Sequence, residues 1–330
     1  MPMVRAFTLG LCLLAAACSP AGSAPVPDGA SQPKKQRIGA IRGGTVKSDK
    51  PPAPKVSNII VYGTDPLQVV DLWMPTSGRP PYPVVLLIHG GCWKTRIAER
   101  DIMDPIAADL AKNGIAVWNI EYRGIDKGGG YPGTFDDVAA AADLLMRDGR
   151  DKYFDVRRAA VLGHSAGGHL AFWLANRPAL PTGSRFRAEK MFVPHTAIAL
   201  AGIPDLRELA TGGHCGTDGA RALSDRGRDF VRTSPPEMTP SAVHQVQYNG
   251  GRDGIAPPDF ARTYETKMAA KGVTVKSFVI PDADHFDLIR PGGPGWNSIR
   301  ATIALALFAR VAPSPHSRYD AGPAPAARSR

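Results

Sequence analysis

Short runs of apolar residues recur along residues 56–311 and alternate with longer segments whose apolar positions follow helical spacing. Residues 84–88 are apolar without interruption, which is typical of a strand buried on both faces of a sheet. Similar runs recur along the chain. We therefore expect eight strands, at residues 59–62, 69–74, 84–88, 115–120, 159–162, 197–200, 245–248 and 275–280.

Segments with helical patterns lie between these runs. One of them ends at Asn113-Gly114, a usual C-terminal stop for a helix. Strands that alternate with helices predict βαβ units, a mainly parallel sheet and helices on both of its faces. Active sites in such sheets lie at the carboxyl ends of the strands. We expect helices at residues 104–112, 134–147, 166–176, 258–271 and 296–311.

The net charge of +10 comes mostly from segments outside this pattern. Residues 19–55 carry seven Lys and Arg against two Asp, and residues 312–330 carry three Arg against one Asp. Both segments lack apolar periodicity, which predicts a disordered tether over 18–55, a disordered tail over 312–330 and one folded domain over 56–311. Nucleic-acid binding would require a structured basic stripe with aromatic residues, and the folded part shows none, so we expect no nucleic-acid partner.

The first 17 residues resemble a secretory signal peptide. Arg5 precedes a largely apolar stretch at 6–17, which is too short to span a bilayer. The sequence Leu-Ala-Ala-Ala-Cys at 14–18 resembles a bacterial lipobox, in which Cys18 would be lipidated and would attach the chain to a membrane. Ala15 stands where a lipobox prefers leucine, so plain cleavage after Ala17 stays open. Both alternatives predict an exported bacterial protein, either periplasmic or a membrane-anchored lipoprotein.

The strand expected at 159–162 runs directly into Gly163-His164-Ser165-Ala166-Gly167, a G-x-S-x-G sequence followed by a helical pattern. In this context the serine occupies a strained turn that raises its Oγ above the sheet. Gly163 and Gly167 lack Cβ atoms, so the strand and helix can approach closely, and the helix N-terminus favours developing negative charge. The sequence therefore predicts that Ser165 is a nucleophile.

A glycine pair follows the buried strand at 84–88, in His89-Gly90-Gly91-Cys92-Trp93. Such a pair is compatible with a simple tight turn. Ahead of a nucleophile elbow, however, an H-G-G-x segment donates backbone N–H groups to a tetrahedral oxyanion. We expect the donors to be the amides of Gly91, Cys92 and Ala166. Cys92 and Cys215 could form one disulfide in an exported protein, but spacing alone leaves this open.

A serine nucleophile needs a base, and the base needs an orienting acid. In folds with a G-x-S-x-G nucleophile elbow, these residues follow along the chain in the order Ser, acid, His. His285 lies in a loop directly after the strand at 275–280 and is the predicted base. Asp253 follows the preceding strand and is the predicted acid, with Asp205 as the alternative. The histidines within the glycine motifs are expected to shape loops: His89, His164 and His169.

With these residues placed, 56–311 resembles the α/β-hydrolase superfamily, and within it the esterase/lipase and kynurenine-formamidase-like branch. The resemblance implies an α/β-hydrolase fold with a mainly parallel eight-stranded sheet. Residues 211–232 depart from the pattern with a polar, Gly- and Arg-rich stretch. The segments that carry the resemblance are His89 to Trp93, Trp118 to Arg123, Pro132 to Asp137, Gly163 to His169, Gly250 to Pro257 with Ala256 in place of the usual Val, and His285-Phe286-Asp287.

The sequence thus predicts a serine esterase that cleaves small-molecule carboxylic esters through an acyl-enzyme intermediate on Ser165. An arylformamidase or other amidase would use the same residues and is an alternative, although its usual substrate belongs to cytoplasmic tryptophan breakdown. A non-catalytic lipoprotein scaffold on the same fold is a third hypothesis. No cofactor is implied, and no His, Cys and Asp residues show metal-ligand spacing.

Overall fold

The structure is a computed structural model that describes residues 55–147, 152–211, 215–227 and 229–308. Contacts divide the chain into two units, residues 1–50 and residues 51–330, and all described residues belong to the second. The predicted signal peptide, Cys18, the tether up to residue 54 and the C-terminal tail lie outside the described residues. Their assignments stay predictions.

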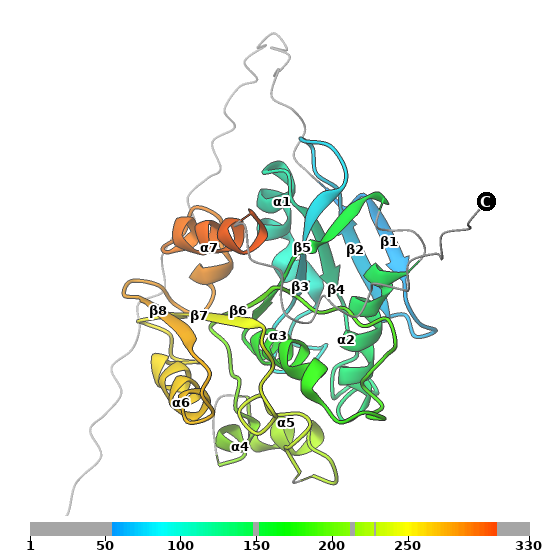
Figure 1. Cartoon of the computed structure of the whole chain (residues 1–330). Helices are drawn as coiled ribbons and strands as arrows, with labels where there is room; N and C mark the ends of the chain where they lie inside the picture. Colours follow the sequence, from blue (N-terminus) through cyan, green and yellow to red (C-terminus); the bar gives the residue numbers. More distant parts are fainter. Residues whose placement is uncertain (1–54, 148–151, 212–214, 228, 309–330) are drawn as a thin grey trace, which may run out of the picture. The chain divides into compact units, whose positions relative to one another are not determined.

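The described residues form one eight-stranded sheet with the strand order β1-β2-β4-β3-β5-β6-β7-β8 (Figure 1). The pairs β1–β2 and β2–β4 are antiparallel, and the remaining neighbours are parallel. This confirms the predicted fold class. The strands are β1 (Asn58–Val61), β2 (Val69–Trp73), β3 (Tyr82–Ile88), β4 (Ala116–Ile120), β5 (Phe154–His164), β6 (Thr196–Leu200), β7 (His244–Gly250) and β8 (Val275–Ile280).

Helices cover both faces of this sheet (Figure 1). On one face, Trp296 Nε1 of α7 donates to Asp109 Oδ2 of α1 over 3.0 Å. On the other face, the rings of Phe172 in α3 and Tyr264 in α6 stack with centroids 5.1 Å apart. The helices are α1 (Asp104–Lys112), α2 (Gly133–Asp143), α3 (Ala166–Asn176), α4 (Leu206–Leu209), α5 (Thr217–Ala222), α6 (Pro258–Ala269) and α7 (Trp296–Phe308).

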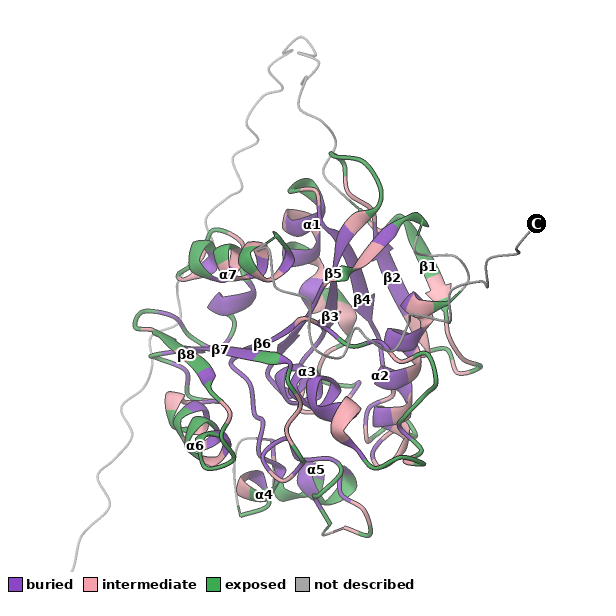
Figure 2. Ribbon diagram, in the orientation of Figure 1, coloured by how far each residue is buried: buried purple, intermediate pink, exposed green. Residues whose placement is uncertain are grey.

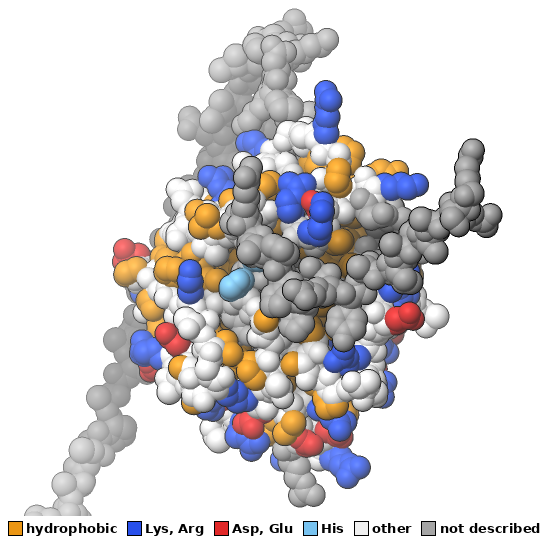
Figure 3. All heavy atoms as spheres, in the orientation of Figure 1, with side chains coloured by type: hydrophobic (Ala, Val, Ile, Leu, Met, Phe, Trp, Pro, Cys, Tyr) orange, Lys and Arg blue, Asp and Glu red, His pale blue; other side chains and the backbone are white. Residues whose placement is uncertain are grey.

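Burial is greatest in the central strands, which are sandwiched between the two helical layers (Figure 2). Every residue of β4 and β6 is buried, whereas the edge strand β1 is largely exposed. Continuous apolar runs therefore marked the strands correctly, because both faces of the inner strands are covered. On the face seen in Figure 3, Lys and Arg side chains are dispersed among acidic, polar and hydrophobic ones.

The predicted elements differ from the structure mainly at their ends. Strand β5 begins at Phe154, five residues before its apolar run, because Tyr82 of β3 pairs with Phe154. Helix α2 ends at Asp143 and continues as a 3₁₀ turn, Leu144–Met146. Helices α4 and α5 were not predicted, since four and six residues are too few to show a helical period. No helix among the described residues is long and apolar enough to cross a membrane.

Candidate active site

Ser165 occupies the sharp turn between β5 and α3, with φ 54° and ψ −118°. Its N–H donates to Leu200 O of β6 over 2.8 Å, which ties the turn to the sheet. A Cβ on Gly163 would lie 1.9 Å from Gly167 O, and one on Gly167 would lie 2.0 Å from Ile88 O. Only glycine fits at these two positions, so the G-x-S-x-G pattern is explained by the close approach of strand and helix.

His285 and Asp253 meet in the loops that follow β8 and β7. Their Nδ1 and Oδ2 atoms lie 2.8 Å apart, and both side chains are buried. Asp253 Oδ1 also accepts the amides of Ile255 and Ala256, each over 2.8 Å. Burial alone would raise the pKa of Asp253, but the hydrogen bonds from His285 and these amides outweigh it and lower that pKa. Asp253 is thus held as a carboxylate beside the imidazole.

Asp205, the alternative acid, lies elsewhere and has other partners. Its Oδ1 accepts the amides of Arg207 and Glu208 and caps α4, while Oδ2 pairs with Lys267 Nζ. The structure therefore brings Asp253, and not Asp205, to His285. Both aspartates lie between Ser165 and His285 in the sequence, so the chain order of Ser, acid and His did not distinguish them.

The predicted oxyanion donors lie in the loop after β3 and at the start of α3. A Cβ on Gly90 would lie 3.0 Å from Ser165 Cβ, so this loop runs directly beside the serine. Gly91 and Cys92 have φ values of 95° and 52°. Within the described residues, the amides of Gly91, Cys92 and Ala166 donate no hydrogen bond. Three free N–H groups beside a nucleophile can bind developing negative charge.

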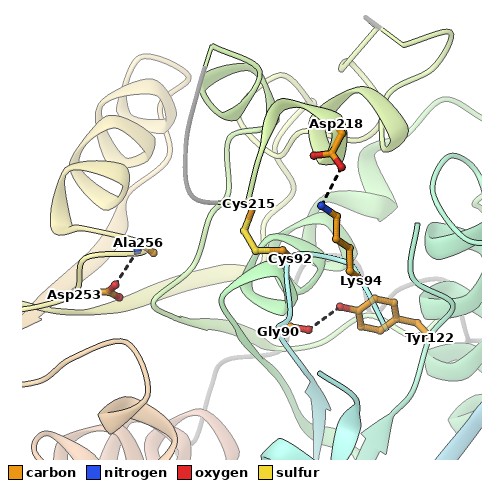
Figure 4. Close-up of a disulfide and its surroundings, with 8 residues drawn as sticks. All are labelled: Gly90, Cys92, Lys94, Tyr122, Cys215, Asp218, Asp253 and Ala256. Carbon is orange, nitrogen blue, oxygen red and sulfur yellow. Dashed lines mark hydrogen bonds and ion pairs between the residues drawn. A yellow bond between two sulfur atoms is a disulfide. The ribbon is translucent and has the colours of Figure 1, made fainter. Parts of the chain in front are cut away.

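Glu121 and Tyr122 contact His89 and Gly90 and so support the loop after β3, a role that the sequence did not reveal. His89 Nε2 lies 2.8 Å from Glu121 Oε1, and His89 Nδ1 donates to Gly90 O over 2.8 Å. Tyr122 stacks on the imidazole of His89 and donates to the carbonyl oxygen of His89. Its hydroxyl also donates to Gly90 O (Figure 4). Because a trans peptide is planar, fixing the Gly90 carbonyl also directs the Gly91 N–H to the opposite side.

The ionisation of Glu121 suits this arrangement. Burial tends to raise the pKa of Glu121, but hydrogen bonding and charge from His89, together with amide bonds, lower it overall. Two sequence signals pointed to Glu121 and Tyr122: their position directly after the buried strand at 115–120, and the resemblance of residues 118–123 to the same part of α/β-hydrolases. Neither signal indicated the contact with His89.

The two other motif histidines are buried and connect the elbow to its surroundings. His164 Nε2 donates to the backbone oxygen of His285 over 2.9 Å, and His169 Nε2 donates to Thr233 O over 2.7 Å. Burial, followed by the nearby His285, lowers the pKa of His164 to about 3. Burial also lowers the pKa of His169 to about 4. Both are therefore neutral donors that shape loops, as predicted.

These neutral histidines should make folding sensitive to mild acid. The pKa of an unfolded histidine is about 6.5, so below that pH residue 169 binds a proton in the unfolded chain. In the folded protein His169 stays neutral down to about pH 4. Stability contributed by neutral His169 is thus complete above pH 6.5 and is lost as the pH falls toward 4, at about 1.4 kcal/mol per pH unit. Urea unfolding at pH 7, 6 and 5 measures this slope.

The variant His169→Gln keeps an Nε2 donor for Thr233 O and removes the titrating group. Its stability should fall less steeply between pH 6 and 5 than that of the wild type. His244→Gln, at an exposed side chain, is the control and should change the slope less than His169→Gln does. Equal slopes for His169→Gln and the wild type would contradict the prediction.

Cys92 and Cys215 form a disulfide with a Cα–Cα distance of 5.2 Å, which resolves the question that the sequence left open (Figure 4). The bond joins the loop beside the nucleophile to the segment that leads into α5. Lys94 Nζ and Asp218 Oδ2, 2.9 Å apart, link the same two segments. No group of three or more His, Cys, Asp or Glu in the described ranges has the geometry to hold a metal ion.

The known proteins similar to this chain include esterases and kynurenine formamidases. The BD-FAE family model matches residues 70–220. The chain is similar to esterase LipC of Mycobacterium tuberculosis, at 28% identity over 76% of this chain and 63% of that protein. It is also similar to a kynurenine formamidase of Salmo salar, at 22% identity over 77% of this chain and 82% of that protein.

Among solved structures, esterase B from Lactobacillus rhamnosis superposes with a TM-score of 0.64 and 22% identity. The match covers 75% of this chain and 84% of that chain. At this identity the likeness shows a common fold. The chain spans 63% of the length of LipC, so similarity to LipC does not extend over that whole protein.

Proposed function

Since the chain has the fold of α/β-hydrolases and is similar to esterases, we propose that it is a serine esterase that cleaves small-molecule carboxylic esters. The observation that carries this proposal is the hydrogen bond between His285 Nδ1 and Asp253 Oδ2, in loops at the edge of the sheet where Ser165 lies. With Nδ1 engaged by a carboxylate, Nε2 is the nitrogen that can take up the serine proton.

The reaction proceeds in two steps. Ser165 Oγ attacks the ester carbonyl while His285 takes its proton, and the amides of Gly91, Cys92 and Ala166 bind the oxyanion. His285 then returns the proton to the departing alcohol as the C–O bond breaks, leaving an acyl-enzyme. Water, deprotonated by His285, attacks the acyl carbonyl. His285 then returns the proton to Ser165 Oγ as the acyl C–O bond breaks, which releases the acid and free Ser165.

A formamidase is the second candidate. Similarity to a kynurenine formamidase over most of both chains favours it, and the same residues would cleave a formamide C–N bond. We place the ester ahead because the LipC and esterase B comparisons both indicate esterases, and because the disulfide favours an exported protein.

Export is the proposed setting of the activity. Disulfides persist in oxidising compartments and are rare in the cytosol, so the Cys92–Cys215 bond supports export of the protein from the cytoplasm. Two features of residues 1–18 also support export: the apolar stretch at 6–17 and the lipobox-like sequence that ends at Cys18. Lipidation of Cys18 would anchor the enzyme, and cleavage after Ala17 would release it.

A fluorophosphonate probe and a substrate panel together test the function. We expect the probe to modify Ser165, identified by peptide mass, and to stop hydrolysis in proportion to labelling. Acetyl, butyryl, octanoyl and feruloyl esters should be cleaved with higher kcat/KM than N-formylkynurenine. A reversed preference would make the formamidase the function, and a wild-type protein that takes no label would favour a scaffold.

A further inference from the structure

Cys92 combines an unfavourable backbone conformation with few backbone contacts. Its φ of 52° lies in the left-handed region, which disfavours residues that carry a Cβ. In the described part of the chain, neither its N–H nor its carbonyl forms a hydrogen bond. The turn hydrogen bond from the Lys94 N–H to Gly91 O encloses Cys92 and Trp93, and Trp93 also has a positive φ, of 55°. One hydrogen bond thus supports two residues in a region that disfavours a Cβ, and the disulfide of Cys92 is a second constraint on this turn.

The residues on either side of Cys92 are held by other contacts. Gly91 O accepts the amide of Lys94 over 2.9 Å, and Trp93 O accepts the amide of Ile125 over 2.7 Å. Trp93 is fully buried, with its ring 5.4 Å from that of His169. The loop is thus fixed at both ends and free of backbone hydrogen bonds at Cys92.

The disulfide connects Cys92 to a well-packed segment. Cys215 is buried, and a Cβ on Gly219 of α5 would lie 3.6 Å from Trp93 Cε3. Ala222 O, at the end of α5, accepts the amide of Tyr131 over 2.7 Å. The Cys215 end of the bond is therefore anchored, and the bond transmits that position to Cys92 (Figure 4).

We infer that the Cys92–Cys215 disulfide is a positioning device for ester hydrolysis, because it holds Cys92 in the left-handed conformation that directs an oxyanion-binding amide toward the substrate carbonyl. The inference rests on the proposed esterase function. Without the bond, a residue with a Cβ at position 92 relaxes toward negative φ, and the free amides of the loop turn away from the oxyanion.

Two double variants that differ only in the Cβ at position 92 test this. Cys92→Ala/Cys215→Ala lacks the bond and keeps a side chain that resists positive φ. Cys92→Gly/Cys215→Ala also lacks the bond, but glycine adopts positive φ readily. Because one oxyanion donor contributes about 10²–10³ in rate, we expect the alanine variant to lose about 10–100-fold in kcat, and the glycine variant to stay within about threefold of wild type.

Steady-state kinetics on p-nitrophenyl acetate with the full chain give kcat and KM. The enzyme concentration used for kcat is the concentration of sites that a fluorophosphonate probe labels. KM should change little, since the amides act on the transition state. Thermal unfolding should show similar destabilisation of both variants. Asp218→Asn, which removes the charge that pairs with Lys94 Nζ and leaves the disulfide in place, is the matched control and should keep the wild-type kcat.

Reduction provides a second test on the wild type. Dithiothreitol would break the S–S bond, leaving thiols on Cys92 and Cys215 while it is itself oxidised to a cyclic disulfide. We expect kcat to fall as in the alanine variant and to return on reoxidation. The glycine variant, which has no bond to reduce, should be indifferent to the reagent.

The inference is overturned if the alanine variant keeps the wild-type kcat, or if both double variants lose the same factor. Equal losses would mean that the bond only stabilises the fold. These outcomes leave the esterase function intact, because labelling and hydrolysis by the wild type report on it separately. A wild-type protein that neither hydrolyses esters nor takes the label would remove the proposed function, and this inference with it.

Discussion

Replacement of Ser165 by alanine is expected to lower kcat for p-nitrophenyl acetate by about 10⁶, which is the effect typical of a nucleophile that works as one unit with its base. Without Oγ, no acyl-enzyme forms, and only catalysis by the oxyanion amides remains. Folding should be little affected, because alanine retains the Cβ and its N–H can still donate to Leu200 O. Initial rates and thermal unfolding measure the two effects.

Two controls accompany this variant. Ser298→Ala, at an exposed position on α7, should keep both the wild-type rate and labelling by a fluorophosphonate. Ser165→Ala should take no label. Residual hydrolysis within tenfold of wild type by purified Ser165→Ala would mean that another group is the nucleophile.

The nucleophile elbow could be predicted from sequence because its signals are local. The two glycines that flank Ser165 are required by backbone contacts within 2.0 Å of their missing Cβ positions, and the strand and helix on either side have their own apolar patterns. His285 could be identified for the same reason, as the one histidine directly after a late apolar run.

Contacts between distant segments could not be predicted in this way. Cys92 and Cys215 are separated by 123 residues, and their meeting depends on how α5 packs on Trp93. Glu121 reaches His89 only because β4 pairs with β3 in a parallel register that aligns Ile120 with Ile88. The hydrophobic pattern predicts that both strands exist, but it carries no information about their register.

The choice between the two aspartates shows the same limit. Asp205 and Asp253 both follow apolar strands, and both are buried. What separates them is the partner each finds: amides of α4 and Lys267 for Asp205, and the imidazole of His285 for Asp253. Such partners depend on loop conformation, which residue spacing does not encode.

Asp253→Asn is accordingly expected to lower kcat by about 10⁴, since an amide that donates to Nδ1 stabilises the wrong tautomer and leaves no carboxylate to balance the imidazolium. The side chain keeps its size, so the amides of Ile255 and Ala256 can still bond to its remaining oxygen. KM should change little, because the carboxylate acts on charge that develops in the transition state. Steady-state rates at pH 8 measure the loss.

Asp205→Asn is the matched control, because it makes the same chemical change at an equally buried carboxylate. It should keep kcat within about threefold and lose about 1–2 kcal/mol of stability, since it weakens the cap of α4 and leaves Lys267 without its carboxylate partner. The opposite result, a slow Asp205→Asn enzyme and a fast Asp253→Asn enzyme, would assign the orienting acid to Asp205. It would also require the loop after β7 to move in solution, because of these two aspartates it is Asp253 that contacts His285 in the structure.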